Sequence, residues 1–407
     1  MARSNSNLKL SLSMPIGETA SGLPTPVFFD PHYAIRINKP PVTLITGSPG
    51  SGKTVTSLLF ASHSAILNKI TFVLDPKGDF IPLKLLEEHG EIENVKIWSV
   101  FSDVKANKVN ERNIGMLDPT CLTENKDENA SLTLETIGTL VKNLNSNQRN
   151  ALIPIIQDEV VAKRPSLSSI KMTLARSQDP EISTIAHELD LALKMPAGKL
   201  LSASTRRPNK LNLKNGIVVA SLMGLSLPSS AKDESKYLEK ERLSVAIIRL
   251  LTHLVLDVMK KIPKTVSKTL FIDEAWVVFN NEAGRNLIEE VSLLGRSLNM
   301  ATVMSTQSPH HVKSSGGKAD LDTTISTRFA FRNPSEKDNT ETTRAMNLPG
   351  GIGYEGAFIK LSDGQCLMKD CQGNFAFVDI VIPDGWLEVF NTTPSPAKRK
   401  KEETKDS

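Results

Sequence analysis

The sequence predicts an α/β fold with a mainly parallel sheet, an all-α insertion and a small β-rich C-terminal segment. From Pro40 the pattern is strand, glycine-rich loop, helix and strand, which is the order of a βαβ unit. Four segments with helical periodicity then follow one another between 132 and 195. From Gly216 onward, strand and helix patterns alternate again, so we expect the sheet to resume there.

The elements can be justified in chain order from these patterns. The opening unit consists of VTLIT, the loop, apolar residues at helical spacing, and KITFVLD; a helix over 80–89 and a strand over 95–100 continue it. Pro165 and Pro180 separate helices in the all-α stretch. The later predicted elements are a strand over 216–225, a helix over 237–261, a strand over 269–276, a helix over 285–299, strands over 301–307 and 328–332, and a β-rich stretch over 365–382.

These patterns divide the chain into regions. Residues 1–26 begin with a stretch rich in Ser and Asn, which predicts a flexible lead. The α/β core is expected over 27–119 and 216–390, and the all-α insertion over 120–215. Residues 391–407 are highly charged, so we expect a disordered tail.

Composition restricts the class of protein. Of 407 residues, 39% are hydrophobic and 23% charged, which supports a sizeable buried core. A net charge of +4 is too small to argue for nucleic-acid binding. The start of the chain has no apolar run typical of a signal peptide, and the most apolar later stretch, 243–259, carries charged residues. The cysteines lack zinc-ligand spacing, so we expect a reduced, cytoplasmic protein without a membrane span; they are Cys121, Cys366 and Cys371.

A phosphate-binding motif lies directly after the first predicted core strand. It matches G-x-x-x-x-G-K-[ST] and consists of Gly47, Ser48, Pro49, Gly50, Ser51, Gly52, Lys53 and Thr54. Glycines let backbone N–H groups turn toward phosphate oxygens, Lys53 would reach the β and γ phosphates, and the Thr54 hydroxyl would bind Mg²⁺. The alternative is a glycine-rich turn with an exposed lysine, which the flanking strand and helix disfavour. The motif therefore predicts an ATP and Mg²⁺ site.

A second motif, TLFIDEAW over 269–276, is an apolar run that ends in two carboxylates. Alone it could be a solvated strand end. Paired with the phosphate loop, it predicts the strand adjacent to the phosphate-loop strand, with Asp273 holding Mg²⁺ through water. Glu274 would then polarise the attacking water, because phosphoryl transfer requires a positioned nucleophile and neutralised charge.

Beyond these two motifs, the chain resembles the FtsK/HerA group of RecA-like motors and, within it, the VirB-type ATPases of conjugative type IV secretion. FVLDPKGDF over 72–80 is similar to the family's second-strand signature. Taken alone, Asp75 to Gly78 would predict only a turn. The all-α insertion, LGRSLNMATVMSTQSP and the closing segment over 356–383 also resemble the family. The resemblance implies a RecA-like P-loop NTPase fold and a ring-forming, hexameric ATPase acting with secretion or conjugation machinery at the inner face of the membrane.

The resemblance also implies further site residues. Gln307 would be the sensor that couples hydrolysis to movement. Arg296, Arg328 and Arg332 are candidates for a charge-neutralising finger, and the first two align best with the family's basic positions. The chain departs from the family in two ways: the phosphate loop begins at Gly47, where a large N-terminal domain usually precedes it, and Ser297 follows Arg296 where the family often has lysine.

Two other functions stay open at this point. One is a DNA translocase or coupling protein of the same superfamily, which would act directly on duplex DNA. The other is a nucleotide-gated assembly factor that binds ATP without hydrolysing it. The resemblance favours a cytoplasmic motor, with peripheral attachment to the cytoplasmic membrane as an open alternative.

Overall fold

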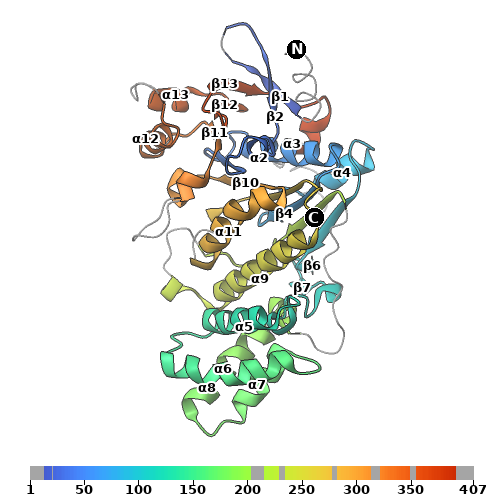
Figure 1. The fold of residues 1–407 in the computed structure, drawn as a ribbon, viewed down its shortest axis with the longest axis vertical. Coiled ribbons are helices and arrows are strands. Elements are labelled where there is room, and N and C mark those ends of the chain that lie inside the picture. Colours follow the sequence, from blue (N-terminus) through green and yellow to red (C-terminus); the bar gives the residue numbers. More distant parts are fainter. Residues whose placement is uncertain are drawn as a thin grey trace, which may run out of the picture.

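One large mixed sheet organises the chain (Figure 1). The computed structural model describes residues 13–20, 22–202, 215–228, 234–276, 282–312, 321–348 and 354–390. Within these ranges the sheet has 11 strands in the order β2-β1-β13-β12-β11-β3-β10-β9-β4-β8-β5. The strands from β11 to β5 pair in parallel, whereas β2, β1, β13 and β12 extend the sheet in antiparallel fashion.

The strand bounds follow the sequence patterns closely. The parallel strands are β11 (Thr327–Phe331), β3 (Val42–Thr46), β10 (Met300–Thr306), β9 (Lys268–Ile272), β4 (Ile70–Asp75), β8 (Ile217–Ser221) and β5 (Val95–Ser99). The antiparallel strands are β12 (Gln365–Lys369), β13 (Phe375–Ile380), β1 (Met14–Thr19) and β2 (Pro26–Phe29). A separate short pair comprises β6 (Phe101–Asp103) and β7 (Lys108–Val109).

The strands of the parallel part are buried on both faces, because helices cover both sides of the sheet. In β9, Leu270 and Ile272 contact one hydrophobic cluster and Phe271 contacts the other. The helices on the Phe271 face are α3 (Lys53–Ile66), α4 (Leu83–Glu88) and α14 (Trp386–Phe390). Those on the opposite face are α9 (Glu239–Lys261) and α11 (Glu282–Leu298). The shorter helices are α2 (Tyr33–Arg36), α12 (Glu336–Ala345) and α13 (Tyr354–Lys360).

The predicted all-α stretch forms four helices at the end of the molecule away from the antiparallel strands (Figure 1). They are α5 (Lys126–Leu140), α6 (Ser146–Val161), α7 (Leu167–Ala175) and α8 (Pro180–Lys194). Asn145 and Gln148 form a capping box at α6, and Asp179 caps α8, which has Pro180 in its first turn. Their apolar residues join one cluster with α9 and the sheet. We propose that 120–215 is a single insertion that packs onto this face.

The prediction of a flexible lead over 1–26 is wrong for the residues that form β1. Ile16 is fully buried, and β1 pairs with β13, with Gly17 opposite Ile380. This pairing joins segments from the two ends of the sequence, so local composition could not reveal it. Residues 1–12 and the predicted tail over 391–407 lie outside the described residues.

The predicted neighbour relation of the acidic strand is also wrong. β10 lies between β3 and β9, pairing in parallel with both. The order of parallel strands depends on how the crossover connections pass over the sheet, which periodicity within a strand does not encode. As a consequence, the end of β10 lies between the phosphate loop and the acidic pair.

A buried ionic cluster joins α2 to the amino-terminal end of the sheet. The Asp30 carboxylate accepts a hydrogen bond from Lys69 Nζ at 2.8 Å and pairs with Arg36 at 2.8 Å. The His32 ring contacts the backbone oxygen of Lys268, the first residue of β9, at 2.9 Å. Burial alone would raise the pKa of Asp30, but His32 and Lys69 hold it well below its usual range.

Replacing Asp30 with alanine is expected to lower the free energy of unfolding by about 3–5 kcal/mol, because Lys69 would stay buried without a carboxylate. The lowered pKa means that this stabilisation is present above the ordinary value of 3.8 and is lost as the pH falls below it. Urea unfolding at pH 7 and at about pH 2.5 measures both effects, because most of the loss lies between pH 3.8 and the much lower pKa of the folded state. The control is Asp190, whose side chain is 27% exposed and pairs with lysines at the surface, and equal losses for Asp30→Ala and Asp190→Ala at pH 7 would contradict the prediction.

Candidate nucleotide-binding site

The phosphate loop connects the end of β3 to the start of α3 and needs glycine at two close approaches. Gly52 has a φ of 108°, and a Cβ there would lie 3.0 Å from the Cα of Gly364. A Cβ on Gly47 would lie 2.7 Å from the Cβ of Phe331. Larger residues would push the loop away from the sheet, so these glycines fix its path.

Hydrogen bonds within the protein hold the loop in place. Ser48 N donates to the Arg332 carbonyl at 2.9 Å, and the Ser51 hydroxyl donates to the Ser48 carbonyl at 2.8 Å. Lys53 Nζ donates to the same Ser48 carbonyl at 2.8 Å. Burial lowers the pKa of Lys53 to about 8, although Glu274 and Asp273 oppose the shift. A bound phosphate would supply the anionic partner that this buried ammonium group needs.

Asp273 directly follows β9 and is 5% exposed. Its carboxylate accepts a hydrogen bond from the Ser305 hydroxyl of β10. Burial raises the pKa of Asp273 to about 7, and the nearby carboxylates of Asp75 and Glu274 add to the shift. The acidic residues at this edge therefore leave an excess of negative charge close to the phosphate loop.

This donor set fits a magnesium ion. Mg²⁺ prefers oxygen ligands and is usually held by one or two carboxylates together with substrate phosphates. Asp273 supplies a buried carboxylate in a negatively charged setting, and Thr54 supplies a hydroxyl in the first turn of α3. Among the described residues no group of three or more His, Cys, Asp or Glu side chains could hold a metal by itself.

Glu274 is anchored by three side chains from three elements. Lys77 and Gln307 both contact its Oε1, the latter at 3.1 Å, and Trp276 Nε1 donates to its Oε2 at 2.7 Å. Its φ of 48° is unusual for a residue with a side chain. Burial would raise the pKa of Glu274, but the hydrogen bonds from Lys77, Gln307 and Trp276 lower it. The carboxylate is thus kept ionised and fixed in position.

The turn after β4 supplies the lysine of this arrangement. Asp75 accepts backbone N–H groups from Gly78 at 2.7 Å, Asp79 at 3.0 Å and Phe80 at 2.9 Å. Burial raises the pKa of Asp75 to about 6, and these N–H groups oppose the shift. The turn that the sequence indicated is confirmed, and it also carries Lys77 to Glu274.

The side chains of the three candidate arginines all bond to partners other than Glu274. Arg328 pairs with Asp322 at 2.7 Å, and Arg332 pairs with Asp363 at 2.8 Å. Arg296 donates to the Asn38 carbonyl at 2.9 Å; Asn38 precedes β3, at the end of the strand opposite the phosphate loop. The structure therefore brings Lys53, Asp273, Glu274 and Gln307 to one edge of the sheet, but not the side chain of Arg296.

Sequence reasoning missed three direct partners of the two acids. In the sequence, Ser305 is only part of an apolar strand pattern, and Trp276 follows the acidic pair without a predicted role in the site. Lys77 stood in a sequence that is typical of turns. The relevant signal was that all three lie at or just after the carboxyl ends of strands, where side chains of a parallel sheet converge.

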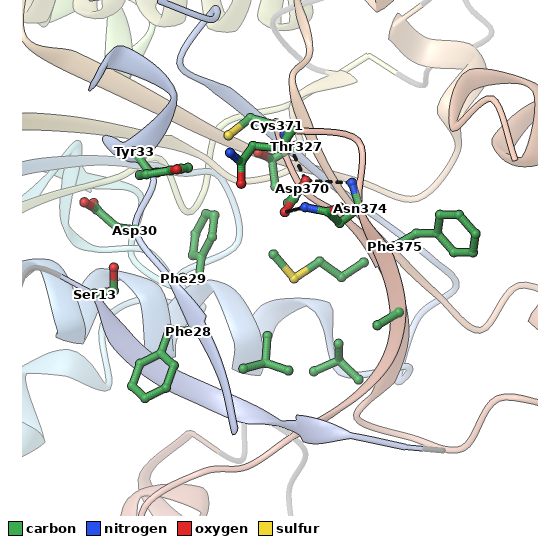
Figure 2. Close-up of a pocket in the computed structure, with 15 residues that line it drawn as sticks. Ser13, Phe28, Phe29, Asp30, Tyr33, Thr327, Asp370, Cys371, Asn374 and Phe375 are labelled. Atoms are coloured by element: carbon green, nitrogen blue, oxygen red, sulfur yellow. Dashed lines mark hydrogen bonds between the residues drawn. The ribbon is translucent and has the colours of Figure 1, made fainter. Parts of the chain in front are cut away.

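A further cavity of about 350 Å³ lies on the antiparallel part of the sheet (Figure 2). Figure 2 shows Phe28, Phe29 and Phe375 around it, with Asp370 bonded to Asn374 at its rim. Thr327, which also lines it, begins β11, whereas the phosphate loop follows the end of the parallel strand β3. The cavity is therefore distinct from the nucleotide site.

The fold is that of a RecA-like P-loop NTPase. The chain belongs to the AAA-like domain family, whose model matches residues 28–390. The match covers both the parallel core and the helices of the proposed insertion.

Solved structures support the fold. VirB4 of Thermoanaerobacter pseudethanolicus superposes with a TM-score of 0.71 at 12% identity, covering 92% of this chain and 97% of VirB4. The bacterial conjugative coupling protein TrwB, lacking its first residues, gives a TM-score of 0.51 at 12% identity, covering 94% of this chain and 92% of TrwB. The expected resemblance to VirB-type ATPases is therefore confirmed for the fold.

A curated relative extends the comparison to sequence. The uncharacterized protein YddE of Bacillus subtilis is 23% identical over 377 residues. The alignment covers 89% of this chain but 44% of YddE, so the chain spans less than half the length of that relative. In the described part of the chain, no helix combines the length and apolar character that crossing a bilayer requires.

Proposed function

We propose that this chain is an ATP-hydrolysing motor that energises conjugative DNA transfer or type IV secretion and works as a ring. One observation carries the proposal: an ionised, triply anchored Glu274 lies next to the buried Asp273, at the sheet edge that also carries the phosphate loop. This arrangement supplies the water-orienting group and the metal ligand that phosphoryl transfer requires.

Each residue has a distinct part in the proposed reaction. Backbone N–H groups of the phosphate loop and Lys53 bind the β and γ phosphates, and Lys53 exchanges its bond with the Ser48 carbonyl for one with phosphate. Thr54 and Asp273 hold Mg²⁺, which when bound neutralises charge on the phosphates. Glu274 orients the attacking water and accepts its proton. Gln307 donates a hydrogen bond to Glu274 and directly follows β10, so loss of the γ phosphate could move β10 through this side chain.

A ring would let an arginine of one subunit act on the nucleotide bound by its neighbour. Arg296 lies at the opposite end of the sheet from its own phosphate loop, so it would act on the nucleotide of a neighbouring subunit. Arg328 and Arg332 could act only after leaving Asp322 and Asp363. We propose a hexamer that operates in the cytoplasm, docked on secretion or conjugation machinery at the inner face of the membrane.

Two alternatives have specific support. The likeness to TrwB, a conjugative coupling protein, favours a DNA translocase that acts directly on duplex DNA. The three contacts to Glu274 would also suit a factor that binds ATP without hydrolysing it, since a carboxylate held by its neighbours is less available to water.

Phosphate release with and without duplex DNA separates these functions. A secretion motor is expected to hydrolyse ATP at a rate that DNA changes by less than about twofold, whereas a translocase is stimulated by DNA in a salt-sensitive manner. A non-hydrolysing factor would form ATP-dependent oligomers equally well in the wild type and in Glu274→Gln. Strong stimulation by DNA would contradict the secretion motor in favour of the translocase.

A further inference from the structure

A lysine outside both the phosphate loop (47–54) and the acidic motif (269–276) makes direct contact with the Glu274 carboxylate. Lys77 follows β4, whereas Glu274 follows β9, the neighbouring strand. Its Nζ contacts Glu274 Oε1. The Glu274 side chain is 9% exposed and that of Lys77 is 49% exposed, so a partly solvated cation pairs with a buried anion.

The backbone that carries Lys77 is fixed independently of this ion pair. Asp75 binds three consecutive N–H groups of the turn, from Gly78 to Phe80. Gly78 has a φ of 85°, and a Cβ there would lie 2.5 Å from Met223 Sδ. The three hydrogen bonds to Asp75 fix the backbone of this turn, so Lys77 can act as a stable reference point for Glu274.

The hydrogen bonds to Glu274 leave limited room for water. An ionised carboxylate offers about four acceptor positions. Lys77 and Gln307 occupy Oε1, and Trp276 occupies one position on Oε2. The remaining position on Oε2 is where an attacking water would bind, and its direction depends on the orientation of the carboxylate plane. The Glu274 backbone adopts an unfavourable left-handed conformation, which the surrounding contacts must maintain. The contacts from Lys77, Gln307 and Trp276 also fix the plane of the carboxylate.

We propose that Lys77 is a positioning residue for hydrolysis: from the turn after β4 it orients the Glu274 carboxylate so that the open position on Oε2 receives the attacking water. The inference rests on the proposed ATPase function. It also explains why a charged residue occupies a turn that Asp75 and Gly78 would form without it.

Kinetics of Lys77→Met provide the first test. Turnover at saturating ATP is expected to fall by about 10- to 100-fold because the base is misplaced, while the Kd for ATP changes less than about threefold because Lys53 still holds the phosphates. Lys77→Arg should recover part of the loss. In the Glu274→Gln background, Lys77→Met should cause no further loss. Wild-type turnover in Lys77→Met would overturn the inference.

Lys84→Met is a matched control. Lys84 has a similarly exposed side chain, at 45%, and pairs with a single glutamate, Glu87, on α4. Its replacement removes the same charge and is expected to leave turnover unchanged. Equal effects of the Lys84 and Lys77 substitutions would attribute the loss to surface charge and overturn the positioning role.

Tryptophan fluorescence tests the geometry without any hydrolysis. Trp276 donates to Glu274, so Lys77→Met is expected to shift the indole emission, and the shift should vanish in a Trp276→Phe background. An unchanged spectrum would overturn the inference whether or not the chain hydrolyses ATP. If Lys77→Met shifts the emission but the wild type shows no turnover, the proposed function is overturned and the Lys77 contact stands.

Discussion

Glu274→Gln is expected to lower ATP turnover by about 10²- to 10⁴-fold, the range that a positioned general base contributes. Glutamine keeps the size of the side chain but cannot accept the proton of the attacking water. The amide can still bond to Trp276 through its oxygen, so the fold should be retained. Phosphate release at saturating ATP measures the loss, and the Kd for ATP should change little because Lys53 and the loop are intact.

Glu290→Gln provides the control for this substitution. Glu290 is a partly exposed acid on α11 that pairs with Lys260, so its change removes the same charge outside the site. Turnover in Glu290→Gln should equal that of the wild type. A Glu274→Gln protein with more than about a tenth of wild-type turnover would refute the role of Glu274 as the base.

Lys53→Ala is expected to abolish stabilisation by ATP. For the wild type, ATP at 100 times its Kd should add about 2.7 kcal/mol to the free energy of unfolding. In the wild type, Lys53 donates to the Ser48 carbonyl and would donate to phosphate when ATP binds. The variant lacks this ammonium group, so ATP should add almost nothing to its free energy of unfolding. Thermal unfolding across an ATP titration in Mg²⁺ measures the difference.

The stability of the nucleotide-free Lys53→Ala protein separates a binding defect from misfolding. Burial lowers the pKa of Lys53, which means that folding disfavours its charged form, so loss of this charge should cost little stability. Lys84→Ala serves as the exposed control and should keep the full response to ATP. An ATP-induced shift of wild-type size in Lys53→Ala would refute phosphate binding by this loop.

Local patterns predicted the parts of the fold that depend on neighbouring residues. The phosphate loop, the four helices of the proposed insertion and the strands of the large sheet from β3 to β13 followed from periodicity and from the positions of glycine and proline. The carboxylates Asp273 and Glu274 and the amide of Gln307 could be placed at strand ends, and the structure brings Glu274 and Gln307 within 3.1 Å.

Features that depend on distant pairing could not be predicted in this way. β1 is held by β13 from the other end of the chain, and β10 is inserted between β3 and β9 by the path of its connections. Lys77 reaches Glu274 because β4 and β9 are neighbours. The sequence separation of these partners hides their contact, even where each segment alone is correctly assigned.

The central claim is that the loop from Gly47 to Thr54 and the acidic pair after β9 form one ATP-hydrolysing site. Phosphate release from ATP by the purified wild-type chain, measured with Mg²⁺ and again with excess EDTA, tests it most directly. We predict turnover that requires Mg²⁺ and that Lys53→Ala removes. Release that persists in EDTA and in Lys53→Ala, or no release above the Lys53→Ala background at saturating ATP, would contradict the account.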